Sequence, residues 1–495
     1  MDKEQLANDS KELKKPDLSA TAIVRLAKET LTLFHTPARE PFARLWVKGH
    51  WEIHRIQSEE FERWLFALCF HRHGTVPGLG SVSAARKVLA ADALFASSEK
   101  SVHVRVAGWD RAIYVDLAND LWEAVKITAE GWTIIPHVPV NFWRPPGMQP
   151  MPQPLQGGTI ADLRPFLNLD SEEQWILSLS WIIAALRPDG PFPLMILEGT
   201  HGSSKSTMAR IFRALVDPST APVRGEPASV RDLMISANNS WSLSYDNLSG
   251  IDNSLCDALC RLSTGGGFST RELFTDAGEK IFEGMRPVVL NGIDIGIERT
   301  DLLDRAITLS LPSISEADRE TEARFWKRFE LARPYILGSL FDLVAYALRR
   351  LPEVQPLNLP RMADFATLIC AVEPALGWPE GTFLRAYRRN RWEANVLGLE
   401  ASPLFQPLMR ISERGPWRGT ATELMSQLVD EQLNDPMGVQ RTYPKAPRQL
   451  SQAIRRLIPS LSQAGITIEF SRSTGSNSER IISIGKVGDA ATQRA

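Results

Sequence analysis

The segment 199–207 reads GTHGSSKST and combines small and hydroxyl residues with a single lysine. Small residues let backbone N–H groups approach an anion closely, and a lysine beside them can neutralise phosphate oxygens. A serine directly after that lysine can place its hydroxyl on Mg²⁺. The spacing fits G-x-x-x-x-G-K-S except at Ser204, where glycine is usual. We therefore predict a loop that binds ATP and Mg²⁺, formed by Gly199, Thr200, His201, Gly202, Ser203, Ser204, Lys205, Ser206 and Thr207.

Two later stretches offer the other groups that an ATP-hydrolysing site needs. The run SWSLSYDNLSG ends a strand pattern at Asp246, which we expect to hold Mg²⁺ together with Ser206. Asp252 is an alternative metal ligand, although its position is more typical of a solvated loop acid. Asn247 stands where many such enzymes carry the glutamate that polarises the attacking water. Asn291 ends the buried run RPVVLNG and could orient that water or sense the γ-phosphate, or simply be a turn residue.

Three arginines could complete the site. Arg299 and Arg305 flank the sequence DLLD ahead of a further strand pattern. An arginine there could reach the ATP of a neighbouring subunit, and a surface salt bridge is the alternative for both. Arg361 begins a helix pattern after NLP and could touch the γ-phosphate from a helical lid.

The elements around these residues must bring their side chains together. PLMILEG, 193–199, is typical of a short buried strand, and TMARIFRALV, 207–216, of a helix. Strand, loop and helix in that order are the context that a phosphate-binding loop needs. Strand-like runs alternate with helices from 159 to 350, which predicts an α/β core, and 315–395 reads mostly as helix.

These motifs, in this order, resemble the AAA+ ATPases, and among them the superfamily 3 and related replicative helicases. The stretches GSSKST, NSWSLSYDNLSG, LCRLSTGGGFSTRELFTD, RPVVLNGI and PRMADFA resemble more closely the ATP-binding proteins of phages, plasmids and integrative elements, described as primase-associated or helicase-like. The resemblance implies a P-loop AAA+ core and a homo-oligomeric ring, expected to be a hexamer. Each arginine finger would then act on the next subunit. Asn247 departs from the helicase pattern.

The resemblance also gives a role to the segment between the Asp246 and Asn291 strands. FSTRELF and EKIFEGM both have strand character and are separated by TDAG, which predicts a hairpin. In ring helicases a hairpin at this place lines the central channel and touches DNA. Arg271 and Lys280 could contact phosphates there, and Phe268 and Phe274 could stack on bases or pack the hairpin.

The end of the chain has the helix, helix, hairpin order of a winged helix. KAPRQLSQAIRRLIPSL has apolar residues at helical spacing, with Arg448, Arg455 and Arg456 on the opposite face. Residues 441–495 hold nine Lys or Arg against three Asp or Glu. Such a basic helix suits the major groove of DNA, and a protein-binding winged helix is the alternative. The basic cluster RAYRRNRWE, 385–393, fits either a lid surface or a DNA contact.

We therefore predict four regions: a disordered tail at 1–20, a small mixed α+β domain at 21–150, the AAA+ core and lid at 151–395, and a winged helix at 396–495. The run FWRPPGMQPMPQPLQGG, 142–158, is a Pro- and Gly-rich linker. The 21–150 domain has no catalytic signature, because Asp116 and Asp120 lack the D-x-D spacing of a primase pair. We expect it to bind DNA or a partner, as a collar.

Composition excludes several classes of protein. The net charge of −2 over 495 residues does not fit a general polyanion binder, so DNA contacts must come from local patches. No run approaches 18 uninterrupted apolar residues, and the charged start lacks the apolar segment of a secretion signal. The four cysteines do not form a disulfide framework, and Cys256 and Cys260 fit core packing better than metal binding. We expect a cytoplasmic protein that contacts no membrane.

The resulting hypothesis is an ATP-dependent motor on single-stranded or forked DNA, a helicase-like ATPase serving replication of a mobile genetic element. It could work with a primase or polymerase. The alternative is an ATP-switched loader or regulator that binds DNA without unwinding it. A third possibility is a scaffold that has lost hydrolysis, for which Asn247 would be the sign.

Overall fold

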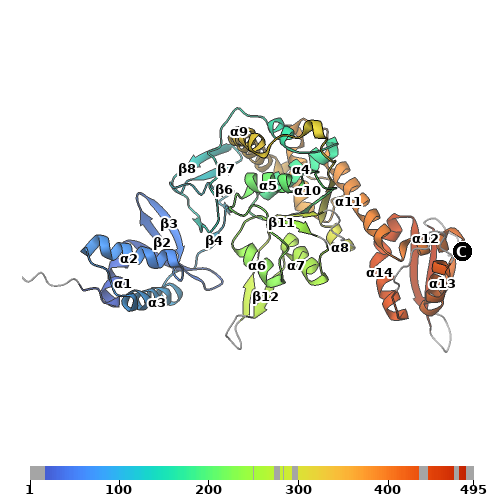
Figure 1. Cartoon of the computed structure of the whole chain (residues 1–495), viewed down its shortest axis with the longest axis horizontal. Coiled ribbons are helices and arrows are strands. Elements are labelled where there is room, and N and C mark those ends of the chain that lie inside the picture. Colours follow the sequence, from blue (N-terminus) through green and yellow to red (C-terminus); the bar gives the residue numbers. More distant parts are fainter. Residues whose placement is uncertain are drawn as a thin grey trace, which may run out of the picture. The chain divides into compact units, whose positions relative to one another are not determined.

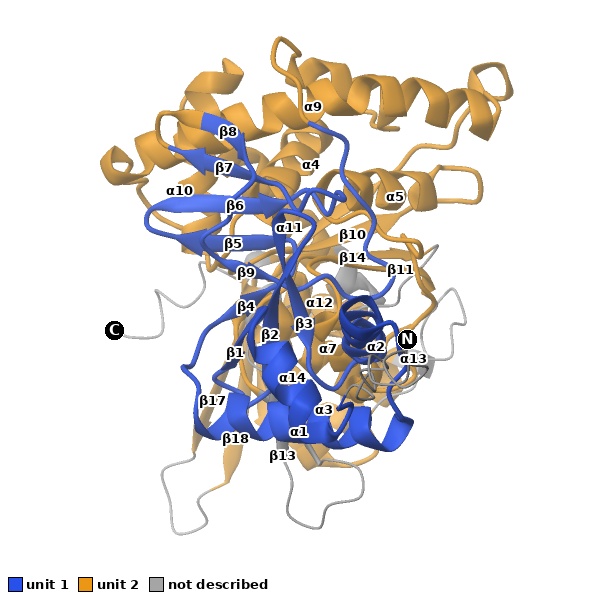
Figure 2. Cartoon of the chain, turned by 90° about the vertical axis from the view of Figure 1, so that its left-hand side faces the viewer, with its two compact units in different colours: residues 1–128, 132–153 blue, residues 129–131, 154–495 orange. Residues whose placement is uncertain are grey.

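The structure is a computed structural model, and it describes residues 17–248, 250–271, 279–282, 284–292, 299–433, 444–472 and 479–486. Most of the predicted 1–20 tail and Phe274 lie outside these residues, as do the side chains of Phe268, Arg271, Lys280 and Arg456. The fold is mixed α/β, with several sheets and many helices. The chain divides into two compact units, 1–128 with 132–153, and 129–131 with 154–495 (Figure 2).

The first unit begins with three helices packed on a small antiparallel sheet. Ser19 and Ser58 cap the first two helices through their side-chain oxygens, and Gly74 ends the second in a left-handed conformation. Ile23, Leu45 and Phe61 lie in the shared core. The elements are α1 (Ala20–Lys28), β1 (Leu31–His35), β2 (Pro41–Val47), β3 (His50–Arg55), α2 (Glu59–His73) and α3 (Leu79–Phe95).

A second antiparallel sheet completes this unit. Its strand order is β5-β6-β7-β8. The short parallel strands β4 and β9 form a separate two-stranded sheet. Asp116 is almost fully buried at the end of β6, where Arg144 Nη2 and Nε bind its carboxylate at 2.7 and 2.9 Å. This ion pair gives Asp116 a structural role. The strands are β4 (Val102–His103), β5 (Val106–Trp109), β6 (Ala112–Asp116), β7 (Ala124–Thr128), β8 (Gly131–Ile135) and β9 (Asn141–Phe142).

A four-stranded parallel sheet in the order β11-β14-β10-β15 forms the centre of the second unit. Its buried aliphatic residues, among them Leu194, Ile196 and Leu290, pack against α6 and α7, while α4 and α5 lie on the other side (Figure 1). The bounds are α4 (Glu172–Ala185), β10 (Leu194–Glu198), α5 (Lys205–Val216), α6 (Val230–Asn238), β11 (Leu243–Leu248), α7 (Asn253–Thr264), β14 (Val288–Gly292) and β15 (Ala306–Ser310).

The predicted hairpin before β14 is present. Strand β12 (Phe268–Arg271) pairs antiparallel with β13 (Glu279–Phe282), and Arg271 lies opposite Glu279 in the register. A bridge between Arg224 and Tyr245 extends the parallel sheet beyond β11. Along the chain, β11 is followed by α7, then by the hairpin, and then by β14, which lies between β11 and β10 in the sheet.

Helices follow β15, as the sequence predicts. They are α9 (Glu322–Arg350), α10 (Ala363–Val372) and α11 (Thr382–Ala401), and a short α8 (Thr300–Leu303) precedes β15. In the described part of the chain, one segment, Glu322–Glu353, is long and apolar enough to pass a membrane-span test of length and composition. Of its most apolar window, 61% is buried inside the fold, as in the core helix of a folded domain.

The last region has the predicted helix, helix and hairpin, with one helix and one strand added before them. α13 (Ala421–Leu433) and α14 (Pro447–Gln463) precede the hairpin of β17 (Ile466–Arg472) and β18 (Arg480–Lys486). The added elements are α12 (Phe405–Glu413) and β16 (Trp417–Thr420), and β16 pairs with β18. Leu450, Ile454 and Ile482 lie in one apolar core that joins α14 to the hairpin.

Candidate functional site

The loop between β10 and α5 has an unusual backbone. Gly199, Gly202 and Ser204 have φ angles of 148°, 78° and 61°, so three of its residues are in conformations that L side chains rarely adopt. A Cβ on Gly199 would lie 2.7 Å from Leu311 O and from Ser203 Oγ, so only glycine fits there. Ser204 occupies the left-handed position directly before α5, which explains why glycine is usual at it. Turns of this kind, ending at a helix N-terminus, direct N–H groups towards an anion.

Lys205, the first residue of α5, folds back over this loop. Its Nζ donates to Gly199 O at 2.7 Å and to Thr200 O at 2.8 Å, with Ser203 Oγ at 3.3 Å. Burial lowers the pKa of Lys205, and nearby Asp246 opposes this shift. Carbonyl oxygens thus hold the ammonium group where a phosphate could replace them.

Ser206 and Asp246 meet although 40 residues separate them. The Ser206 hydroxyl donates to Asp246 Oδ1 at 3.1 Å. Asp246 lies near the carboxyl end of β11, where its own N–H donates to Arg224 O at 2.7 Å. A hydroxyl and a carboxylate are the hard oxygen ligands that Mg²⁺ prefers, so this donor pair fits the metal that the sequence predicts.

Asn291 lies beside this pair at the end of the strand between β10 and β11. It is paired in register with Leu197, and its side chain is fully buried. Its Oδ1 accepts the N–H of Asn247 at 3.1 Å, whereas its Nδ2 has no partner among the described residues. A buried amide N–H without a partner costs about 1–3 kcal/mol, so this donor is suited to a ligand or a water molecule. Asn247 has a φ of 58°, which asparagine tolerates better than glutamate.

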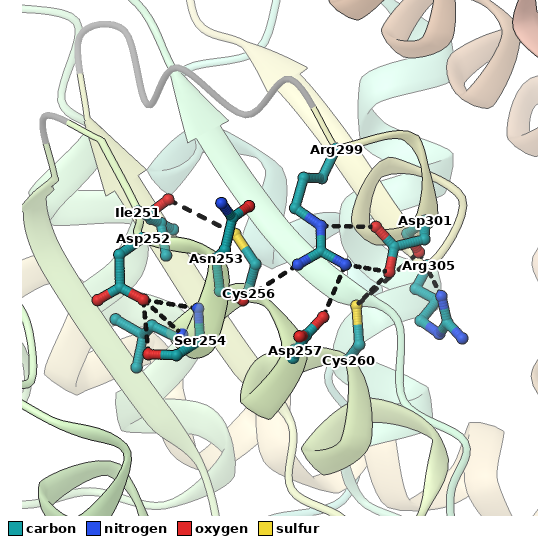
Figure 3. A network of polar contacts seen from close by, with 11 residues as sticks. Ile251, Asp252, Asn253, Ser254, Cys256, Asp257, Cys260, Arg299, Asp301 and Arg305 are labelled. Carbon is teal, nitrogen blue, oxygen red and sulfur yellow. Dashed lines mark hydrogen bonds and ion pairs between the residues drawn. The ribbon is translucent and has the colours of Figure 1, made fainter. Parts of the chain in front are cut away.

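Arg299 and Arg305 differ in how far their side chains are engaged (Figure 3). Arg299 binds both carboxylate oxygens of Asp301 at 3.1 and 3.0 Å and Asp257 at 2.6 Å. Burial opposes its charge, but the hydrogen bonds to the two aspartates outweigh that effect and raise the pKa of Arg299. Arg305 donates from Nη1 to Asp301 O, and its buried Nε has no partner among the described residues. Arg299 therefore forms the salt-bridge cluster that the sequence offered as an alternative, and Arg305 keeps spare donors.

Cys256 and Cys260 lie in the core between α7 and the parallel sheet. Burial raises the pKa of both thiols to about 11. Among the described residues, no group of three or more His, Cys, Asp or Glu side chains could hold a metal ion. The two cysteines pack in the core, as we expected.

The basic cluster at 385–393 is largely occupied by structural contacts. Arg391 pairs with Asp304 at 2.7 Å, and Arg389 pairs with Glu173 and Glu393. Asn390 holds α11 against β15 by accepting from Thr308 N–H at 3.0 Å and donating to Thr308 O at 2.6 Å. These contacts favour the lid surface over a DNA contact. Arg361 is exposed just before α10, and no hydrogen bond or ion pair joins it to another described residue.

A groove of about 760 Å³ lies between α14 and the β17–β18 hairpin. Arg448 and Arg455 line it, as the sequence predicts, and Arg455 stacks 3.9 Å over the Phe470 ring. Sequence reasoning missed Arg472 and Arg480, which also line it and lie directly opposite each other across the hairpin. Like charges in this arrangement repel, so an anion in the groove would stabilise both.

Sequence reasoning also missed Asn168. Its Nδ2 donates to Ser203 O at 3.0 Å and to Pro312 O at 2.6 Å, and so joins the phosphate-binding loop to the chain after β15. Asn168 lies far from the loop in sequence and belongs to no motif, so no local signal indicated this role.

Two family models match the chain. One, for the actinomycete integrative conjugative element replication protein, matches residues 160–392, and one for the AICE RepA C-terminal domain matches 404–493. The two matches together cover well over half of the chain. The chain belongs to this family of replication proteins. It is a replication protein of an integrative conjugative element. The phosphate-binding loop, Asp246 and Asn291 fall within the first matched range, and the arginines that line the groove beside α14 fall within the second.

A search of curated proteins found no match. Similar solved structures include three apo structures of the NrS-1 C-terminal region. Their sequence identity to this chain is 11–12%, and their TM-scores are 0.38–0.39. The matches cover 93–94% of this chain and 98–100% of the other chains. Likenesses at these scores carry no argument about function.

Proposed function

We propose that this replication protein is an ATP-driven motor on nucleic acid, a helicase-like ATPase with a P-loop core of the AAA+ class. The observation that carries the proposal is the contact of Ser206 with Asp246 beside Lys205. P-loop enzymes bind phosphate and Mg²⁺ with a lysine, a serine or threonine and an aspartate, and these three residues are of those types. Ser206 and Asp246 meet although 40 residues separate them. The parallel sheet supports the proposal, because ligands of such sheets bind at the carboxyl ends of the strands.

In the proposed site, Lys205, Ser206, Asp246 and Asn291 bind the nucleotide, the metal ion and the attacking water. Lys205 leaves the loop carbonyls to bind the β- and γ-phosphates, and the loop N–H groups bind the other phosphate oxygens. Ser206 and Asp246 hold Mg²⁺, which neutralises charge on the phosphates. The free Nδ2 of Asn291 orients the attacking water or binds the γ-phosphate.

The water-activating base is the part that departs from other enzymes of this kind. Asn247 cannot accept a proton as a glutamate does, and its backbone conformation suits asparagine. Hydrolysis then depends on Asn291 and on charge supplied by a neighbouring subunit. Arg305 is the better candidate for that arginine finger, because Arg299 is held by two aspartates. This arrangement requires a ring of subunits, for which we propose a hexamer.

Two surfaces support action on DNA. The first is the groove between α14 and the β17–β18 hairpin, which we call the α14 groove. It is lined by Phe470 and by four arginines, Arg448, Arg455, Arg472 and Arg480, and Arg455 stacks on the Phe470 ring. Arginines suit phosphates, and an aromatic ring suits bases. The β12–β13 hairpin lies between α7 and β14, the strand that carries Asn291, and so is linked along the chain to the proposed ATP site. We propose that the C-terminal region is a DNA-binding winged helix and that the hairpin carries Arg271 and Lys280 to DNA.

Asn247 also favours a second candidate function. A site that binds ATP but hydrolyses it slowly suits an ATP-switched loader that binds DNA without unwinding it. The two functions differ in strand displacement on forked DNA. We expect the motor to release a labelled strand only with ATP and Mg²⁺, and Lys205→Ala to abolish both release and ATP turnover. ATP turnover without strand release would favour the loader, and turnover unchanged in Lys205→Ala would contradict the site itself.

A further inference from the structure

Arg319 lies over the phosphate-binding loop. It follows the short 3₁₀ turn Glu316–Asp318 and precedes α9. A Cβ built on Gly202 would lie 3.7 Å from Arg319 Nη2, so the guanidinium would be in van der Waals contact with a side chain at this position of the loop. No hydrogen bond or ion pair joins Arg319 to another described residue.

The segment that carries Arg319 is fixed to the loop at several points. Leu311 N–H donates to Glu198 O at 2.8 Å, and Ile314 N–H donates to Gly202 O at 3.3 Å. Asn168 binds carbonyls on both sides, Ser203 O and Pro312 O. Ser315 then caps the 3₁₀ turn by accepting from Asp318 N–H. The position of Arg319 over Gly202 therefore follows from backbone contacts on the same chain.

Arg319 has no paired acid among the described residues. Lys205 lies in the same loop, and the N–H groups at the start of α5 add partial positive charge. The acids next to Arg319 are engaged elsewhere, because Asp318 accepts the Ser315 hydroxyl at 2.6 Å and Glu320 pairs with Arg324 and Arg328. An arginine without a paired acid, beside a loop that carries a lysine and ends at a helix N-terminus, is suited to a polyanion. The acid near Lys205 is Asp246, which accepts the Ser206 hydroxyl and is the residue proposed to hold Mg²⁺.

We infer that Arg319 is a second phosphate-binding cation of the nucleotide site, acting on the nucleotide bound by its own chain. The inference rests on the proposed function. Gly202 belongs to the part of such a loop whose N–H groups surround the α- and β-phosphates, whereas the lysine reaches the β- and γ-phosphates. Arg319 therefore binds α- or β-phosphate oxygens and contributes equally to ATP and ADP binding.

The test is equilibrium binding of fluorescent ATP and ADP to the full chain. Arg319→Ala should weaken both by about 10- to 100-fold, as expected for a lost charge-assisted hydrogen bond, and Arg319→Lys should weaken both less. The matched control is Arg324→Ala, five residues away, whose side chain is 76% exposed and paired only at 3.7 Å. It should bind both nucleotides as the unchanged protein does. Melting temperatures should be equal, because Arg319 has no partner to lose.

The outcomes separate the inference from the proposed function. Failure of the unchanged protein to bind either nucleotide would contradict the proposed function. Normal ATP and ADP binding by Arg319→Ala would overturn the inference alone. A loss confined to ATP would also overturn it, because the contact would then be with the γ-phosphate.

Mixing subunits tests whether Arg319 acts within its own chain. Arg319→Ala mixed with Lys205→Ala should regain no ATP turnover, because each site takes both residues from one chain. Regained turnover in this mixture would place Arg319 in the site of a neighbour and overturn the assignment.

Discussion

Ser206 Oγ lies 3.1 Å from Asp246 Oδ1, although the two residues belong to different elements, α5 and β11. The contact predicts how magnesium should act. Ser206→Ala and Asp246→Asn should each raise the Mg²⁺ concentration needed for half-maximal ATP turnover, because each removes an oxygen ligand or its charge. A magnesium titration of ATPase activity measures this.

The control for this prediction is Asp252→Asn. Asp252 caps α7 by accepting from the N–H groups of Ser254 and Leu255, and asparagine caps helices about as well. The magnesium dependence should be unchanged. A shift as large as that of Asp246→Asn would instead make Asp252 the metal ligand.

The left-handed conformation of Ser204 predicts which residues its position accepts. Ser204→Gly should keep nucleotide affinity within about threefold, because glycine adopts this conformation without strain. Ser204→Val should lower both affinity and stability, the latter by about 1–3 kcal/mol, because β-branched residues are strained at positive φ. Nucleotide titration and thermal unfolding of the two variants check this. Equal behaviour of valine and glycine would mean that the loop has another conformation.

The different environments of Arg305 and Arg299 predict different results in mixing experiments. Arg305→Ala mixed with Lys205→Ala should restore part of the ATP turnover, because some interfaces then contain an intact lysine and an intact finger. Arg299→Ala should mainly reduce stability, by about 1 kcal/mol, because its side chain is 30% exposed and its pairs are partly screened. Restoration by Arg299→Ala and not by Arg305→Ala would reverse the assignment.

The α14 groove predicts a change in the salt dependence of DNA binding. Each of Arg448, Arg455, Arg472 and Arg480 that contacts a phosphate contributes about 0.9 to the slope of log K against log salt. The double variant Arg472→Ala/Arg480→Ala should therefore lower the slope by up to about 2. Arg418→Ala, on the exposed part of β16 outside the groove, is the matched control. Equal slopes for the double variant and the control would contradict DNA binding in this groove.

The thiols of Cys256 and Cys260 predict slow alkylation that depends on pH. With the pKa of each raised to about 11 by burial, only about one thiol in a thousand is ionised at pH 8. The ionised fraction, and with it the alkylation rate, should rise about tenfold per pH unit below 11. The rate should also increase sharply on unfolding, because unfolding removes the burial that raises the pKa. Iodoacetamide labelling followed by mass spectrometry measures both. Fast labelling at pH 7 in the folded protein would show that these thiols are exposed or ionised.

The sequence alone determined what is contiguous along the chain. The loop, the strand before it and the helix after it follow from one stretch of residues, and the helix, helix, hairpin order of the last region follows from local periodicity. The order of Asp246 and Asn291 along the chain was also readable, because each ends a buried strand pattern.

Only the tertiary structure decided which distant residues meet. The parallel sheet brings Asp246 to Ser206, and it buries Asn291 beside Asn247 with one amide donor free. Backbone contacts carry Arg319 to the loop. These pairings arise from the packing of strands and helices against one another, which no local pattern of residues encodes.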